Sequence, residues 1–298
     1  MADQIPTRTL GRTGLEVGRL GFGAMEFRGE PRGRATTDGE AGEVLNNVLA
    51  AGINYVDTAN DYGLSEERIG RSIASRRSEY FLATKCGCPG PSGGEHEWDR
   101  ENLFRGLNQS LDLLKTKHVD VMQLHNPSVE DAETHGVVDS LNEMRDSGSV
   151  RHIGISTTLP DLPTYIDWGV FDVFQIPYSA LNREHENWIS KAAQAGIGTV
   201  IRGGVQKGQP GDGRGSIEAW ETFDKANLDE LREDGESRTA FLLRFTLSHP
   251  DIHTIIVGTM STEHLRQNLD TTRRGPLAPD VYAEARRRLD EVGETPAS

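Results

Sequence analysis

Short runs rich in apolar and β-branched residues alternate with amphipathic helical stretches along almost the whole chain. A short run of this kind, bounded by polar residues or glycine, predicts a buried strand. The chain offers eight strand candidates, and each of them is followed by a helical stretch or a long loop. The candidates are Arg19–Gly21, Ile53–Val56, Tyr80–Ala83, Val119–Leu124, His152–Ile155, Val173–Gln175, Thr199–Ile201 and Ile252–Val257.

Between these runs, leucine and valine recur at helical spacing, as in Arg100–Leu114 with Leu103, Leu107, Leu111 and Leu114. The other expected helices are Glu40–Ala51, Val137–Asp146, Glu186–Ala195, Arg238–Leu247 and a charged helix near Val281–Val292. Strict alternation of strand and helix predicts a closed parallel barrel of the (β/α)8, or TIM, type. A length of 298 residues fits one such domain spanning residues 1–298.

An open, doubly wound sheet is the alternative arrangement, and it requires a glycine-rich phosphate turn after its first strand. The segment Gly21-Phe-Gly23-Ala-Met-Glu26 begins like such a turn, but Glu26 occupies the place of the third glycine. The barrel is therefore favoured. Two additions to it are expected: an N-terminal β-hairpin around Gly11–Gly14, and a long irregular loop, Gly203–Gly235, after the seventh strand.

The net charge of −14 argues against nucleic acids or anionic membranes as general partners. The N-terminus lacks an apolar stretch of signal-peptide length, and no run reaches the roughly 20 apolar residues of a membrane span. Only Cys86 and Cys88 are present, which fits a reducing compartment, and we interpret them as small residues lining the loop after the third strand. The alternative, a redox or metal role for the Cys-Gly-Cys segment, needs partner residues that the sequence does not show. These features predict a cytoplasmic protein whose oligomeric state the sequence leaves open.

Polar side chains follow three successive strand candidates: Asp57 and Tyr62, then Lys85, then His125. In a barrel these positions meet at the face that carries the chemistry. A phenol whose ordinary pKa is about 10 becomes a better acid when a nearby ammonium ion favours its ionised form. Lys85 would supply that ion, Asp57 would keep it charged, and His125 would donate to a carbonyl oxygen. The four residues therefore predict a site for hydride transfer to a carbonyl carbon.

The chain resembles the aldo-keto reductases over essentially its whole length. The segments that carry the resemblance include GINYVDTANDYGLSEERIG, the ATK strand, VDVMQLHNP, HIGIST, FQIPYS and IIVGTMSTEHLRQN. The resemblance places the family's catalytic tetrad on Asp57, Tyr62, Lys85 and His125. It implies an NADP(H)-dependent oxidoreductase that reduces small aldehydes or ketones to alcohols.

The resemblance also implies where the nicotinamide lies. Ser156 and Gln175 match the residues that hold its carboxamide, while Thr157 replaces the asparagine that usually follows the serine. Arg202 stands where many relatives have an aromatic ring stacked on the nicotinamide. A planar guanidinium can stack there too, and its charge would disfavour the oxidised cofactor; the alternative is an arginine paired with a nearby carboxylate.

For the rest of the cofactor, glycine-rich turns and a helix N-terminus suit phosphate groups. Gly203, Gly204 and Lys207 are candidates for the pyrophosphate. The expected adenosine-end residues are Gly258, Thr259, Ser261, His264, Gln267 and Asn268. Some relatives have a lysine and an arginine at the positions of Gly258 and His264, so NADP is favoured here with NAD left open.

The substrate pocket is expected in the loops over the barrel mouth. Its candidate residues are Met25, Glu26, Phe27, His96, Trp98 and Asn126. Phe27 and Trp98 would supply apolar walls, and Glu26 and His96 would orient hydroxyl groups. Because the chain ends soon after its last helix, the mouth is expected to be open and tolerant, and the physiological substrate stays unidentified.

Two other functions share these features and stay open at this point. One is redox-neutral dehydration or epimerisation through a transient ketone on a bound nicotinamide. The other is a non-catalytic, cofactor-sensing subunit like the potassium-channel β-subunits. A metal-dependent mechanism is disfavoured, because Lys85 at the centre of the site would repel a cation, so no metal is expected.

Overall fold

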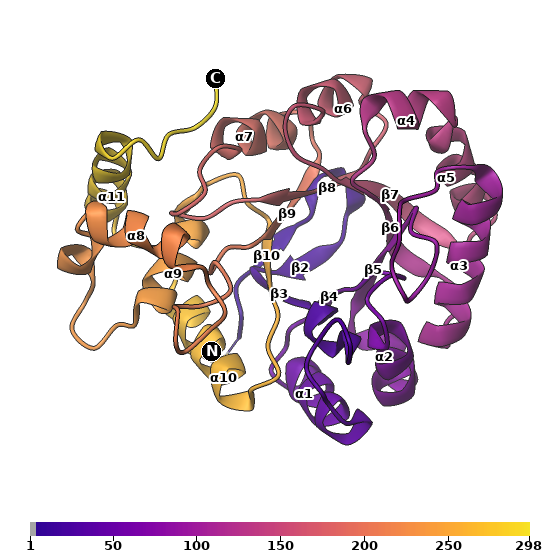
Figure 1. Ribbon diagram of the computed structural model, residues 1–298, viewed down its shortest axis with the longest axis horizontal. Helices are drawn as coiled ribbons and strands as arrows, with labels where there is room; N and C mark the ends of the chain where they lie inside the picture. Colours follow the sequence, from indigo (N-terminus) through magenta and orange to yellow (C-terminus); the bar gives the residue numbers. More distant parts are fainter. Residues whose placement is uncertain (1–3) are drawn as a thin grey trace.

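Eight parallel strands close into a barrel, and helices surround it (Figure 1). The computed structural model describes residues 4–298. Around the barrel the strand order is β10-β3-β4-β5-β6-β7-β8-β9, which confirms the predicted (β/α)8 fold. The barrel strands are β3 (Leu20–Gly23), β4 (Tyr55–Asp57), β5 (Phe81–Cys86), β6 (Val119–His125), β7 (Val150–Ser156), β8 (Val173–Pro177), β9 (Gly198–Arg202) and β10 (Thr254–Val257).

Each predicted helix forms, with ends within two residues of those expected. The helices are α1 (Asp38–Ala50), α2 (Ser65–Ile73), α3 (Arg100–Leu114), α4 (Val129–Thr134), α5 (Val137–Asp146), α6 (Leu162–Trp168), α7 (Glu186–Gln194), α8 (Ile217–Lys225), α9 (Arg238–Ser248), α10 (Thr262–Arg274) and α11 (Pro279–Glu291). Short 3₁₀ segments are η1 (Gly11–Thr13), η2 (Ala24–Arg28), η3 (Ala74–Glu79) and η4 (Leu228–Leu231). Polar caps fix several starts: Thr37 and Glu40 form a capping box on α1, and Asp99 caps α3.

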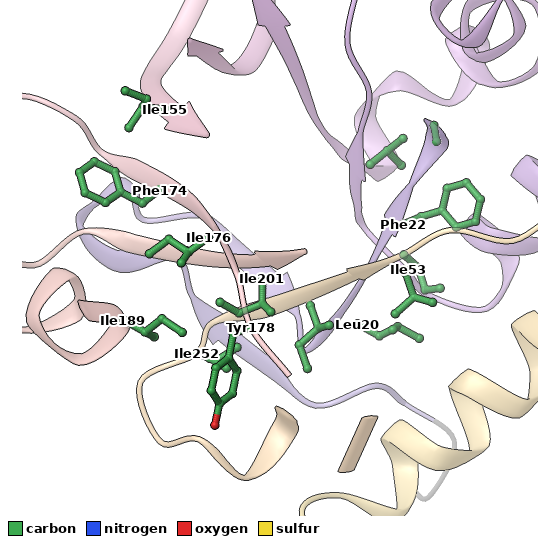
Figure 2. Packing of buried hydrophobic residues seen from close by; sticks show 14 of the residues in the cluster. Leu20, Phe22, Ile53, Ile155, Phe174, Ile176, Tyr178, Ile189, Ile201 and Ile252 are labelled. Atoms are coloured by element: carbon green, nitrogen blue, oxygen red, sulfur yellow. The ribbon is translucent and has the colours of Figure 1, made fainter. Parts of the chain in front are cut away.

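The main hydrophobic core lies between the strands and the surrounding helices. Figure 2 labels some of its members, including Phe174 and Ile176 of β8, Ile201 of β9 and Ile189 of α7. Because successive strand residues point to opposite faces, each strand sends one set of side chains to this layer and the other into the barrel. The inward set is therefore free to carry polar groups at the ends of the strands.

A second, smaller hydrophobic cluster lies inside the barrel and includes Tyr55, Val121 and Val200. The predicted hairpin forms from β1 (Thr7–Thr9) and β2 (Glu16–Gly18). It adds Leu10 and Val17 to this cluster, and the backbone N–H of Arg12 donates to the carbonyl of Gly196, just before β9 begins. The hairpin therefore closes the end of the barrel where the strands begin, opposite the face expected to carry the chemistry.

The segment 203–235 corrects one expectation. We expected an irregular stretch, but it contains α8 and η4, because Trp220 and Phe223 are buried and Ser216 caps the helix by accepting a hydrogen bond from the Ala219 N–H. Only the part before Ser216 is a long loop. In the part of the chain that the structure describes, no helix combines the length and the apolar character needed to cross a bilayer.

Candidate active site

The ends of two neighbouring strands bring an ion pair to the centre of the barrel mouth. Asp57 is the last residue of β4, and Lys85 lies near the end of β5. Lys85 Nζ donates to Asp57 Oδ2 at 2.6 Å and to the Thr58 carbonyl at 2.8 Å. Lys85 is 1% exposed and Asp57 2% exposed. Such a pair is stable only because hydrogen bonds satisfy its remaining polar atoms.

Two amides complete the surroundings of Asp57. Gln123 of β6 and Gln175 of β8 both donate to Asp57 Oδ1, at 2.9 and 2.8 Å. Gln123 was not among the site residues expected from the sequence. Its position two residues before His125 on the same strand was the available signal, because alternate residues share a face. Both carboxylate oxygens of Asp57 are thus occupied, and the carboxylate is fixed in place.

Tyr62 lies in the turn between β4 and α2, with its ring centroid 5.0 Å from Lys85 Nζ. Burial raises the pKa of Tyr62, and the Lys85 ammonium lowers it by a smaller amount. Lys85 therefore acts in the expected direction, but the net shift is upward rather than toward a more acidic phenol. The consequence is a phenol that carries its proton at neutral pH.

His125 ends β6, and its ring centroid lies 6.0 Å from that of Tyr62 in an edge-on arrangement. Burial, followed by the positive charge of Lys85, lowers the pKa of His125 to about 2. The imidazole is therefore neutral at ordinary pH and has one N–H to donate. Its Nδ1 lies 3.1 Å from Cys88 Sγ and 3.6 Å from Asp61 Oδ1.

A cavity of about 870 Å³ opens over this cluster and is lined by Asp57, Tyr62 and His125. It also brings together all but one of the residues expected to hold the cofactor. Those on its wall are Ser156, Gln175, Arg202, Gly203, Gly204, Lys207, Gly258, Thr259, Ser261, His264, Gln267 and Asn268. Thr157 is the exception: it is buried, and its hydroxyl donates to the Thr158 carbonyl at 3.4 Å.

Arg202 ends β9 and lines the cavity. Among residues 4–298, no carboxylate lies within ion-pair distance of its guanidinium, so the paired-arginine alternative does not apply to this structure. Burial lowers the pKa of Arg202. A half-buried cation without an ionic partner therefore faces the space into which a ligand would enter.

The wall of the cavity also carries charges of both signs. Ser261 caps α10 by accepting a hydrogen bond from the His264 N–H at 3.2 Å. Basic residues on the wall are Arg34, Lys207, Arg214 and Arg274, and acidic ones are Asp212, Glu236 and Asp270. A local basic group and a helix N-terminus thus occur together in an otherwise acidic chain, which suits an anionic ligand group.

The expected substrate-pocket residues divide into two groups. Met25, Glu26 and Asn126 line the cavity, and Glu26 forms an ion pair with Arg214 of the long loop. The exposed ring of His96 lies outside the cavity wall, 5.3 Å from that of His125. Neither Phe27 nor Trp98 reaches the cavity, a correction to the expected apolar walls.

These two rings turn into the hydrophobic core instead. Phe27 is fully buried, with its ring centroid 5.5 Å from that of Phe22. Trp98 packs against Gly87, where a Cβ atom would lie 2.0 Å from the indole ring. The free energy gained by burying a large aromatic side chain explains why these rings lie in the core, although their positions in loops suggested that they would line the cavity.

Comparisons with known proteins agree with the barrel fold. The Aldo/keto reductase family model matches residues 19–289. The uncharacterized oxidoreductase YqkF of Bacillus subtilis is 29% identical, over 92% of this chain and 93% of that protein. L-galactose dehydrogenase of Arabidopsis thaliana is 25% identical, over 89% and 88%. The holo-form structure of aldo-keto reductase AKR11C1 from Bacillus halodurans superimposes with a TM-score of 0.83 at 25% identity, over 96% of both chains.

Proposed function

The chain belongs to the aldo/keto reductase family, a family of oxidoreductases, and we propose that it reduces small aldehydes or ketones to alcohols with NADPH. One observation carries the proposal: the buried Lys85–Asp57 pair lies beside the Tyr62 phenol at the wall of a large cavity. A charged pair in this position is costly to bury and contributes most when it stabilises charge that develops during a reaction.

The four residues have separate roles in this proposal. When bound, reduced nicotinamide supplies a hydride to the carbonyl carbon. Tyr62 gives its proton to the carbonyl oxygen, and Lys85 stabilises the phenolate that forms. Asp57 keeps Lys85 charged and oriented. Neutral His125 donates one N–H to the same oxygen and so aligns the substrate.

The wall of the cavity fits a dinucleotide. Ser156 and Gln175 would hold the nicotinamide amide, with Arg202 beside the ring. Gly203, Gly204 and Lys207 would meet the pyrophosphate through backbone N–H groups and one ammonium ion. A side chain at position 258 would meet the Gly23 carbonyl, since a Cβ there would lie 2.5 Å from that oxygen, so Gly258 offers only its backbone.

At the adenosine end we propose Thr259, Ser261, His264, Gln267 and Asn268 as the contacts. The N-terminus of α10 and the nearby basic side chains favour a 2′-phosphate, which is the basis for NADP over NAD. The same end carries Asp212 and Asp270, so the preference is expected to be moderate.

The test is a panel of aldehydes, diketones, quinones and keto-sugars, with NADPH or NADH oxidation followed by absorbance. We expect turnover of at least one carbonyl class, with a higher kcat/KM for NADPH. Turnover with neither cofactor would refute the proposal, provided that the protein is shown to be folded. A kcat/KM that favours NADH would refute the cofactor assignment alone.

A further inference from the structure

A thiol, two imidazoles and a carboxylate lie close together at His125, and of the four residues only His125 lines the cavity. We propose that they form a binding site for a divalent metal ion of the zinc type. The four residues are Asp61, Cys88, His96 and His125. The proposal concerns metal binding and does not depend on the reductase activity.

The spacing of the donor atoms suits one tetrahedral ion. Cys88 Sγ lies 3.1 Å from His125 Nδ1, and the ligand atoms of Cys88, His96 and His125 all lie within 4.8 Å of one another. With Zn–S and Zn–N bonds of about 2.3 and 2.0 Å, two ligands of one zinc ion are about 3.5 Å apart. Small side-chain rotations would bring these three atoms to that separation.

Asp61 supplies an independent observation. Its Oδ1 atom is buried, accepts no hydrogen bond from any residue between 4 and 298, and lies 3.6 Å from His125 Nδ1. Arg32 holds the rest of the residue by donating to the Asp61 carbonyl at 2.6 Å and to Oδ2 at 3.4 Å. A buried carboxylate oxygen without a partner is costly, and a metal ion would satisfy it.

The loop after β5 is built so that its two ligands lie close together. Gly87 has a φ of +100°, which a residue with a side chain rarely adopts, and the Trp98 ring packs against it. The Glu97 N–H donates to the Gly87 carbonyl at 2.7 Å and closes the loop. Cys88 is thereby buried while the exposed ring of His96 offers a route from solvent.

Charge does not oppose the ion as strongly as the position of Lys85 suggests. The ammonium of Lys85 is balanced by Asp57 at 2.6 Å. Binding of a divalent ion displaces the thiol proton of Cys88 to solvent, so that Cys88 coordinates as a thiolate. One thiolate and one carboxylate then balance the two charges of the cation.

Occupation would also fix the proton of His125. With Nδ1 bound to the ion, the single ring proton must be on Nε2. None of Asp61, Cys88 and His96 lies on the cavity wall, so the ion would lie behind the imidazole and leave the cavity open. Metal ions could therefore occupy the site together with a ligand in the cavity.

The experiment uses the reduced, chelator-treated full chain and titrates it with Co²⁺, without cofactor or substrate. We expect a thiolate-to-cobalt charge-transfer band in the near ultraviolet, strong visible bands typical of tetrahedral cobalt, saturation at one ion per chain, and displacement by Zn²⁺. Cys88→Ser should abolish the charge-transfer band. The matched control, Cys86→Ser, should keep it, because Cys86 contacts the Gln123 carbonyl and lies outside the cluster.

His96→Ala provides a second variant that is safe for folding, since His96 is exposed. It should weaken Co²⁺ binding about tenfold or more. Circular dichroism of each variant would establish that it is folded. Absence of the band in the native chain, its survival in Cys88→Ser, its equal loss in Cys86→Ser, or unchanged affinity in His96→Ala would overturn the proposal.

Discussion

Lys85 Nζ and Asp57 Oδ2 lie 2.6 Å apart at the centre of the barrel mouth, and both side chains are buried. Burial lowers the pKa of Lys85, but Asp57 and Tyr62 together more than reverse this effect, and the net shift is upward. The ammonium ion therefore stays charged at neutral pH. Everything proposed about proton transfer from Tyr62 depends on that charge.

Replacing Lys85 by an uncharged residue should destabilise the protein, because the carboxylate of Asp57 would remain buried without its cationic partner. In Lys85→Met, only the amides of Gln123 and Gln175 would still stabilise the carboxylate. We expect the free energy of unfolding, measured in urea, to fall by about 3 kcal/mol, together with loss of carbonyl reduction. Lys117→Met, a change at an exposed lysine, is the control. Equal stability of the two variants would contradict the account of the pair.

Removing only the proton donor should separate chemistry from binding. Tyr62→Phe deletes a hydroxyl and keeps the ring beside Lys85. We expect kcat to fall by about 10²- to 10⁴-fold, because general acids contribute rate factors of that size. NADPH affinity, measured by fluorescence titration, should change little. Turnover within a few-fold of the native rate would show that another group supplies the proton.

The unpaired guanidinium of Arg202 should set the balance between cofactor forms. Its positive charge would disfavour the cationic, oxidised nicotinamide relative to the reduced one. We expect the ratio of the dissociation constants for NADP⁺ and NADPH to fall by about tenfold in Arg202→Tyr. Arg202→Lys, which retains a charge, should keep most of the native ratio. Identical ratios in all three proteins would end the hypothesis.

Glu66 should make the protein less stable at alkaline pH. Burial raises the pKa of Glu66 to about 7, while its Oε1 accepts a hydrogen bond from Thr84 at 2.6 Å. Because the folded state holds this proton more tightly, the contribution is complete below the unfolded pKa of 4.5 and declines as the pH rises through 7. We expect Glu66→Gln to remove this decline.

The measurement is urea unfolding of native protein and Glu66→Gln at about pH 5 and pH 8.5. The variant should gain about 2 kcal/mol relative to the native protein between the two conditions, as the linkage relation requires for a shift of this size. The amide of the variant keeps an acceptor for Thr84. Parallel pH dependences would show that Glu66 is ionised in the folded state.

The sequence predicts the barrel well, because the spacing of apolar residues distinguishes helices from strands and the order of these elements indicates the fold. Arg100–Leu114 forms a helix with the expected ends, since its leucines repeat at helical spacing and Asp99 caps it. The polar residues after the strands also come together as expected, because parallel strands end at one face. In contrast, α8 was not predicted. A glycine-rich loop sequence precedes it, and only Trp220 and Phe223 mark its buried face.

Side-chain direction within loops was the less predictable part of the site. Phe27 and Trp98 turn toward the core, and sequence spacing carries no information about the path of a short loop. For the same reason, the sequence did not predict that Cys88 and Asp61 lie close to His125, since this depends on the paths of two different loops. The pKa of Tyr62 differed from expectation because burial, a property of the folded surroundings, outweighs its nearest charge.

The hairpin formed by β1 and β2 has a practical consequence for handling the protein. Leu10 and Val17 are fully buried, yet they precede residue 19, where the match to the family begins. A recombinant fragment that begins at residue 19 would expose the side chains of Tyr55, Val121 and Val200 to water at the end of the barrel where the strands begin. Removing the hairpin would thus destabilise the barrel, although it would change none of the four residues proposed for catalysis.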